Sequence, residues 1–257
     1  MLLKNKNAVI YGAGGSIGGA VARAFAREGA AVFLTGRTLA SLNAVAEDIS
    51  ASGGRAKTAI VDALDEKVVD KHLAGIVNNA GSIDISFNVI GLEDVQGIPL
   101  AEMSLEDFTR PIFISMQTQF ITAKAAAKYM IKQGRGVILS LTATPSAKAY
   151  ALTGGFGPAC NAMEGFVRNL AAELGPLGIR VVCMRSAGSP DSAVFIKAMA
   201  EEKKLAKSAI TDIANDTMLK RLPAMAEIAS VATFLVSDMA SAMTGTVANV
   251  TCGTTMD

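Results

Sequence analysis

The feature that most constrains the fold is a regular alternation of short β-branched runs with longer Ala-rich segments of helical periodicity. This alternation is typical of a parallel sheet with helices packed on both faces. No linker, repeat or low-complexity tract interrupts it, so residues 1–257 are expected to form a single doubly wound α/β domain with a mostly parallel sheet of about seven strands. Strands are expected at 7–12, 30–36, 56–62, 83–87, 136–142, 179–186 and 247–252, and helices at about 17–28, 38–52, 66–80, 104–133, 158–175 and 224–237.

Composition argues against several classes of function. The chain has 257 residues, 51% of them hydrophobic, and a net charge of +1, so it lacks the basic excess that a nucleic-acid surface needs. His72 is the only histidine, which argues against a Ser-His-Asp apparatus and against a histidine-based metal site. Cys160, Cys183 and Cys252 form no CxxC pair, as expected of reduced thiols in a cytoplasmic protein. Glycines break the first apolar run, so neither a signal peptide nor a membrane span is expected.

The stretch YGAGGSIGGA stands at the first strand–helix junction. Backbone N–H groups at the start of such a helix can hold a pyrophosphate, and glycines let it approach closely. Gly12, Ser16 and Gly18 fit the spacing G-x-x-x-small-x-G, whereas Ile17 stands where G-x-G-x-x-G requires its third glycine. Tight packing of a strand on a helix also uses glycine. The nucleotide interpretation makes Gly12, Ser16, Ile17 and Gly18 candidate cofactor contacts.

Two charged residues are expected at the same edge of the sheet. Arg37 follows the second strand, where an acidic residue would bind a ribose 2′-hydroxyl, and an arginine there suits a 2′-phosphate. Asp62 ends the third expected strand and can accept a hydrogen bond from an adenine amino group. The structural alternatives are a surface arginine and an aspartate that caps the next helix.

An Asn/Gly signal that suits the turn after the fourth strand occurs twice, at 78–81 (NNAG) and at 88–91 (NVIG). A strand directly before NNAG leaves roughly nine residues for the preceding loop and helix, and a parallel crossover needs about a dozen or more. A helix over 66–80 instead ends at Gly81 and leaves 83–87 as the strand. We therefore predict that NNAG is a helix end and that NVIG is the crevice turn.

The segments 162–184 and 219–253, together with the Gly-rich turn, resemble the short-chain dehydrogenase/reductase family over nearly the whole chain. The resemblance implies a single Rossmann-type domain that binds NADP(H) or NAD(H), acts on a small carbonyl or alcohol, and forms a homodimer or homotetramer. Arg37 implies NADP(H) over NAD(H). The residues that match the family's cofactor contacts are Gly12, Gly18, Arg37, Asp62, Asn88 and Gly91.

The family's catalytic Asn-Ser-Tyr-Lys tetrad is not retained. Alignment on EGFVRNLAAEL puts the tyrosine position at Phe156 and the lysine position at Cys160. The asparagine position falls at Ser115, and the serine position falls at about Thr142, with one residue of slack. No Tyr-x-x-x-Lys occurs anywhere in the chain. In the family the tyrosine transfers the proton of the reacting oxygen, so the resemblance implies a scaffold without its usual acid.

Two hypotheses of function remain open. In the first, the protein is an oxidoreductase with a relocated proton donor, for which Tyr150, beside Lys148, is the candidate; a solvent-facing loop tyrosine is the alternative. In the second, it binds a nucleotide without catalysis, as a partner subunit or ligand-binding module. Cys160 is either an activated thiol at a helix start or a small apolar filler. Residues 189–222 occupy the family's substrate-lid region, but their apolar stripe suits core packing equally, so the substrate is not identified.

Overall fold

The computed structural model describes residues 1–201 and 203–256 and contains one seven-stranded sheet in the order β3-β2-β1-β4-β5-β6-β7. All six strand pairings are parallel. The strands are β1 (Asn7–Tyr11), β2 (Ala31–Gly36), β3 (Arg55–Ile60), β4 (Ile85–Asn88), β5 (Gly136–Ala143), β6 (Ile179–Ser186) and β7 (Val247–Val250). The helices are α1 (Ser16–Arg27), α2 (Leu39–Ala51), α3 (Glu66–Ala80), α4 (Leu105–Gln133), α5 (Phe156–Leu174), α6 (Ala193–Glu201), α7 (Lys203–Asn215) and α8 (Met225–Val236).

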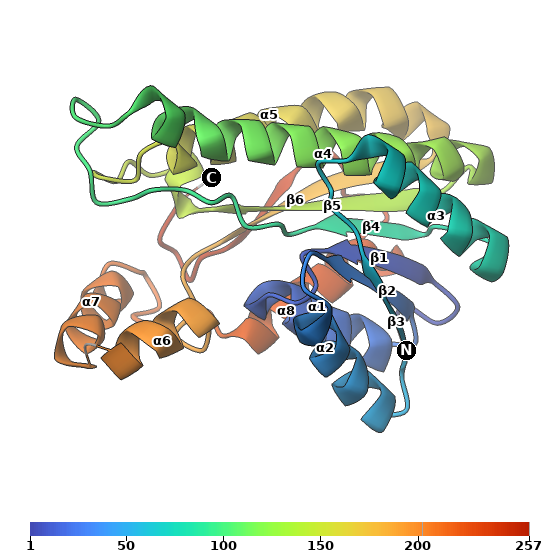
Figure 1. The fold of residues 1–257 in the computed structure, drawn as a ribbon, viewed down its shortest axis with the longest axis horizontal. Coiled ribbons are helices and arrows are strands. Elements are labelled where there is room, and N and C mark those ends of the chain that lie inside the picture. Colours follow the sequence, from blue (N-terminus) through green and yellow to red (C-terminus); the bar gives the residue numbers. More distant parts are fainter. Residues whose placement is uncertain (202, 257) are drawn as a thin grey trace.

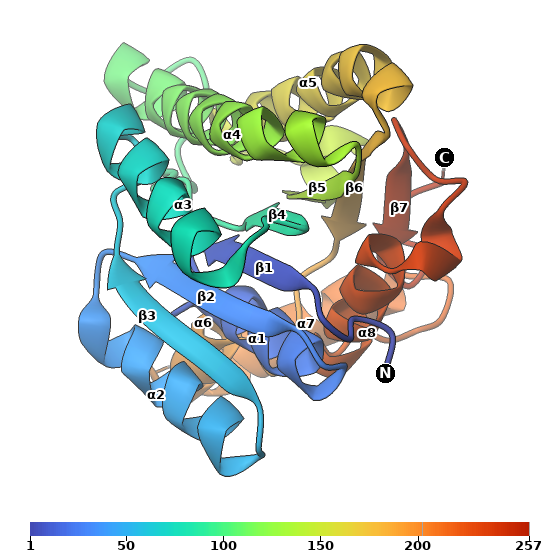
Figure 2. The same cartoon turned by 90° about the vertical axis from the view of Figure 1, so that its right-hand side faces the viewer.

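Helices cover both faces of the sheet, as the alternating pattern predicts. Figure 2 shows α3, α4 and α5 on one face and α1, α2 and α8 on the other. Each face has its own apolar core: Phe25, Leu34 and Ile228 belong to the cluster under α1 and α8, and Leu73 and Met130 belong to the cluster under α3 and α4. In Figure 1, α6 and α7 lie together at one end of the molecule. The single α/β domain expected from the sequence is therefore the observed fold.

The doubled Asn/Gly signal resolves as predicted. Helix α3 begins after Asp65, whose side chain accepts hydrogen bonds from the backbone N–H groups of Lys67 and Val68. It ends at Gly81, whose φ of 86° is the left-handed conformation that favours glycine. NNAG is thus the helix end. Strand β4 starts at Ile85, two residues later than expected.

Two further boundaries differ from the expected ones by a few residues. Strand β3 ends at Ile60, so Asp62 lies in the loop beyond it rather than at its end. Strand β7 ends at Val250, and Cys252 then adopts a φ of 55°, which an extended strand does not allow. Both strands end earlier than expected, where the chain leaves the neighbouring parallel strand and turns.

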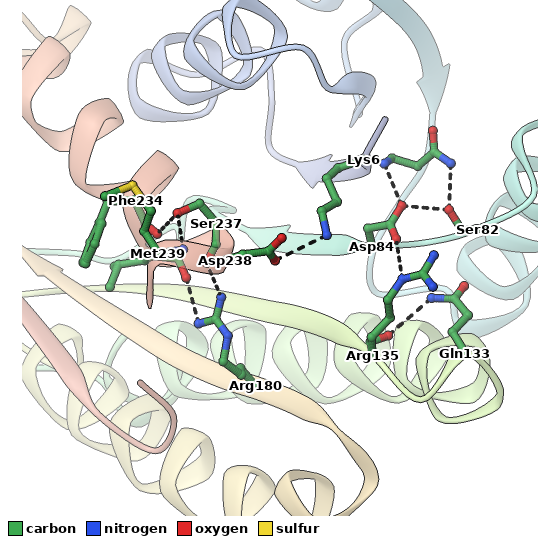
Figure 3. Close-up of polar contacts among 12 residues, drawn as sticks. Lys6, Ser82, Asp84, Gln133, Arg135, Arg180, Phe234, Ser237, Asp238 and Met239 are labelled. Carbon is green, nitrogen blue, oxygen red and sulfur yellow. Dashed lines mark hydrogen bonds and ion pairs between the residues drawn. The ribbon is translucent and has the colours of Figure 1, made fainter. Parts of the chain in front are cut away.

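Polar contacts join the amino ends of the strands (Figure 3). Asp84, just before β4, accepts a hydrogen bond from the backbone N–H of Asn7 at 2.9 Å. Arg180 in β6 donates to the carbonyl oxygens of Leu235 at 2.8 Å and Ser237 at 2.9 Å, at the end of α8. Arg180 thereby satisfies carbonyl groups that a helix leaves unpaired at its C-terminus.

Replacing Arg180 with alanine is expected to lower the free energy of unfolding by about 2–3 kcal/mol, because the carbonyl groups at the end of α8 lose a charged donor. Urea denaturation measures the change. The matched control is Lys6→Ala, which removes an exposed ion pair with Asp238 and is expected to cost about 1 kcal/mol or less. Equal losses in the two variants would show that the carbonyl contacts of Arg180 are not specific stabilisers.

Candidate functional site

A cavity of about 730 Å³ lies across the carboxyl ends of β1, β4, β5 and β6. The strand order reverses between β1 and β4, which is the place where open parallel sheets bind ligands. The lining residues that matter below are Ser16, Ile17, Gly18, Asn88, Gly91, Gln119, Thr142, Tyr150, Phe156, Cys160, Met163, Ser189 and Phe195. The sheet therefore gathers most of the sequence-predicted candidates at one opening.

The Gly-rich turn forms the wall of the cavity beside β1. Gly12 has a φ of 82°, and a Cβ added at Gly18 would lie 2.3 Å from the carbonyl oxygen of Gly12. Larger residues would push the turn apart, so both glycines are required by close approach. Gly15 precedes α1 without a side-chain cap, which leaves the first N–H groups of the helix available to an anion. The Ser16 hydroxyl accepts a hydrogen bond from the backbone N–H of Ala193, which ties the start of α6 to this turn.

The turn after β4 lines the cavity beside the Gly-rich turn. The Asn88 side chain donates to the Thr122 hydroxyl at 3.1 Å, and its carbonyl oxygen accepts from the backbone N–H of Ile90 at 3.2 Å. Asn88 therefore shapes the turn through protein contacts. A Cβ at Gly91 would meet no atom within 4 Å, so this glycine faces open space.

A smaller hollow of about 190 Å³ adjoins the cavity and contains Arg37, Asp62 and Glu93. Arg37 forms an ion pair with Glu93, with 2.8 Å between Nη2 and Oε1. The Asp62 carboxylate accepts a hydrogen bond from the backbone N–H of Leu64, so it also shapes its own loop. Sequence reasoning missed Glu93, whose only signal was its position two residues after the crevice turn.

The tetrad positions are brought together only in part. Phe156 and Cys160 both line the cavity from the first turns of α5. The Thr142 hydroxyl donates to the Glu164 carboxylate at 3.0 Å, so its hydrogen is directed into the protein. The next residue, Ala143, lines the cavity without a hydroxyl. Ser115 is buried in α4 and donates to the carbonyl oxygen of Ile112 at 2.9 Å; it is not among the lining residues.

The environment of Cys160 is apolar. The residue is fully buried and packs with Leu92, Ala159 and Met163. Burial raises the pKa of the Cys160 thiol to about 11, so the thiol is protonated near neutral pH. This favours the apolar-filler interpretation over the activated thiol.

A buried ion pair that the sequence analysis missed lies beneath the cavity. Arg185 and Glu164 meet at 2.9 Å, and their side chains are 5% and 6% exposed. Arg185 also donates to the Ser146 hydroxyl at 2.8 Å, in the short turn Thr144–Ser146 after β5. Burial opposes ionisation of Glu164, but hydrogen bonds from Arg185, Ser146 and Thr142 outweigh it and hold the pKa of this carboxyl below its ordinary value. In the sequence, the only signals of this ion pair were a glutamate on an apolar helix face and an arginine in a buried strand.

The described part of the chain, 1–201 and 203–256, gathers no group of three or more His, Cys, Asp or Glu side chains suited to a metal ion. No helix within these residues is long and apolar enough to cross a membrane. All three cysteines are free thiols.

A glycine-rich helix start beside the reversal point of a parallel sheet defines a dinucleotide-binding α/β protein. The sequence profile described as enoyl-(acyl carrier protein) reductase matches residues 12–255. The chain belongs to the short-chain dehydrogenase/reductase family. Gluconate 5-dehydrogenase of Gluconobacter oxydans (strain 621H) is 28% identical over 259 residues, which cover 99% of this chain and 96% of that protein.

Two solved structures have closely similar folds. NAD⁺-bound xylitol dehydrogenase aligns with a TM-score of 0.91 and 24% identity, covering 98% of this chain and 100% of that chain. A gluconate 5-dehydrogenase from Burkholderia cenocepacia J2315, in complex with NADP and tartrate, aligns with a TM-score of 0.87 and 22% identity over 98% of this chain and 96% of that chain. At these identities the two structures show the fold alone.

Proposed function

We propose that this chain binds NADP(H) in the crevice and transfers hydride between the cofactor and a small carbonyl or alcohol, with Tyr150 as the proton donor. The start of α1 would hold the pyrophosphate through its N–H groups, and Arg37 would contact the 2′-phosphate. When bound, the nicotinamide supplies or accepts the hydride. Homo-oligomerisation as a dimer or tetramer and a cytoplasmic location are further expectations from the family resemblance.

The residues present fit a dinucleotide. The glycines of the first turn leave backbone N–H groups bare at a helix start, as a phosphate requires. One buried hydroxyl that borders the cavity, that of Ser189, has no hydrogen-bond partner within the described residues. A buried polar group of this kind is normally paired, so it suits a polar ligand.

The observation that carries the proposed chemistry is the position of Tyr150. Of the chain's three tyrosines, all within the described residues, it alone lines the cavity that also contains Phe156 and Cys160. The Lys148 ammonium lies 5.6 Å from the centroid of the Tyr150 ring and is held by an ion pair with Asp216. Tyr150 O–H would donate its proton to the substrate oxygen as the carbonyl is reduced, and the Lys148 charge would stabilise the phenolate that remains.

The cavity lining suggests the substrate class. Phe156, Met163 and Phe195 give the cavity a largely apolar wall. The side-chain oxygen of Gln119 already accepts a hydrogen bond from the Ser140 hydroxyl at 2.9 Å. A small, mainly apolar carbonyl compound fits this lining better than a polyol. We propose that residues 189–222 form the lid of this site, because Ser189, Phe195 and Ile213 border the cavity from the segments after β6.

A specific observation favours a second candidate function. Phe156 has no proton to give, and Cys160 carries neither the reach nor the charge of a lysine. With these two side chains at the reacting end of the cavity, the protein would bind a nucleotide without catalysis and serve as a partner subunit or ligand-binding module.

The proposal is tested first by binding. Titration of NADPH and NADH against wild type, followed by nucleotide fluorescence, is expected to give saturable binding. Gly18→Ala should weaken both nucleotides at least about tenfold, or ~1.4 kcal/mol, because its Cβ would collide with the carbonyl of Gly12. The matched control is Gly75→Ala in α3, where an added Cβ meets nothing within 4 Å. Absence of binding by the folded wild-type protein would contradict both candidate functions.

A further inference from the structure

The smaller hollow contains an acidic residue that no family motif supplies. Glu93 lies at a φ of 54°, in the left-handed region that glutamate rarely adopts. Its carboxylate meets the guanidinium of Arg37 at 2.8 Å, although 56 positions separate the two residues in the chain. Both side chains remain accessible to a ligand, at 49% exposure for Glu93 and 67% for Arg37.

The charges of this hollow are not those of a simple phosphate site. Arg37 is its one cation among the described residues, and Asp62 and Glu93 both contribute carboxylates. A 2′-phosphate would bring further negative charge beside two anions, and it would have to displace Glu93 from Arg37. A 2′-hydroxyl, by contrast, is neutral and can donate a hydrogen bond to a carboxylate. Arg37 therefore favours a ribose that carries a 2′-phosphate, whereas Glu93 favours a ribose that carries a 2′-hydroxyl.

We propose that Glu93 determines how strongly this site distinguishes NADP(H) from NAD(H). Its carboxylate competes with the 2′-phosphate for Arg37 and offers an acceptor to the 2′-hydroxyl. The acidic residue missing from the end of β2 is thus supplied by the loop after β4. This role rests on the proposed function, because it requires that the crevice binds a dinucleotide.

The test is a comparison of NADPH and NADH affinities by isothermal titration calorimetry. Glu93→Gln is expected to tighten NADPH binding by about 2–5-fold, which is the range that an exposed ion pair supports. NADH affinity should stay the same or weaken by less than about threefold. The effect should shrink at high salt, because the groups are exposed. In an Arg37→Ala background, Glu93→Gln should increase NADPH affinity much less, because the cation for which Glu93 and the phosphate compete is absent.

Two variants separate charge from backbone effects. Glu93→Gly removes the carboxylate and accepts the positive φ without strain, so it should reproduce the Glu93→Gln shift. Glu47→Gln removes an exposed carboxylate in α2, outside the crevice, and should leave both affinities unchanged. A shift in Glu93→Gly alone would assign the effect to loop strain and overturn the proposal.

The outcomes distinguish this proposal from the one on which it depends. If wild type binds either nucleotide and Glu93→Gln leaves the NADPH-to-NADH ratio unchanged, the Glu93 assignment is wrong while the dinucleotide site stands. Equal tightening of both nucleotides would also overturn it. If folded wild type binds neither nucleotide, both proposals are wrong.

Discussion

Replacing Tyr150 with phenylalanine is expected to lower kcat by about 10²–10⁴-fold, the usual contribution of a positioned general acid. Phenylalanine keeps the ring that packs near Lys148 and removes only the hydroxyl. NADPH affinity should therefore stay within about twofold of wild type. The measurement is the steady-state rate of NADPH oxidation with a saturating panel of small carbonyl compounds.

The matched control is Tyr129→Phe, which removes a hydroxyl on α4 beside the core cluster and away from the cavity. It should leave kcat unchanged. A Tyr150→Phe variant as active as wild type would exclude Tyr150 as the donor. If wild type binds NADPH but turns nothing over, and Phe156→Tyr/Cys160→Lys creates turnover, the non-catalytic candidate is favoured.

Replacing Arg185 with methionine is expected to lower the free energy of unfolding at neutral pH by about 3–5 kcal/mol. Removal of one partner leaves the Glu164 carboxylate buried without its cation. The hydroxyls of Thr142 and Ser146 do not replace that charge. Chemical denaturation with urea measures the loss, and the exposed pair of Lys124 and Glu66 supplies the control, since Lys124→Met should cost about 1 kcal/mol or less.

The pH dependence of this effect has a defined sign. In the wild type the folded-state pKa of Glu164 lies below its ordinary value of 4.5. The pair therefore contributes full stability above that ordinary value and loses it as the pH falls through the folded-state pKa. The gap in unfolding free energy between wild type and Arg185→Met should narrow on acidification, because the Glu164 carboxylate can then be protonated. A gap independent of pH would point to lost packing around Arg185.

A double variant separates the pair from its surroundings. Glu164→Leu/Arg185→Met removes both charges together, and apolar replacements of buried pairs are often neutral or stabilising. It should recover most of the stability lost in Arg185→Met alone. If the double variant is as unstable as the single one, the buried charge of Glu164 is not the cause.

Much of the scaffold is readable from local pattern. The 66–80 helix and its stop at Gly81 follow from helical periodicity and a glycine at the C-terminus, both of which depend on neighbours along the chain. Length alone decided between the two Asn/Gly turns, because a parallel crossover needs a minimum number of residues. The absence of Tyr-x-x-x-Lys is likewise a property of the sequence. The expected boundaries differ from the observed ones by about two residues at the ends of β3 and β7 and at the starts of β4 and α5.

The chemistry of the site depends on contacts that no local pattern encodes. Arg37 faces Glu93 across 56 positions, and Glu164 meets Arg185 across 21. The Thr142 hydroxyl is directed into the protein because Glu164 lies behind it, and Tyr150, in the loop between β5 and α5, borders the cavity. The sequence by itself thus determined the strands, the helices other than α6 and α7, their order and the absence of a Tyr-x-x-x-Lys motif. The tertiary structure decided which charges meet and which hydroxyls face the cavity, because those depend on the packing of segments distant in the chain.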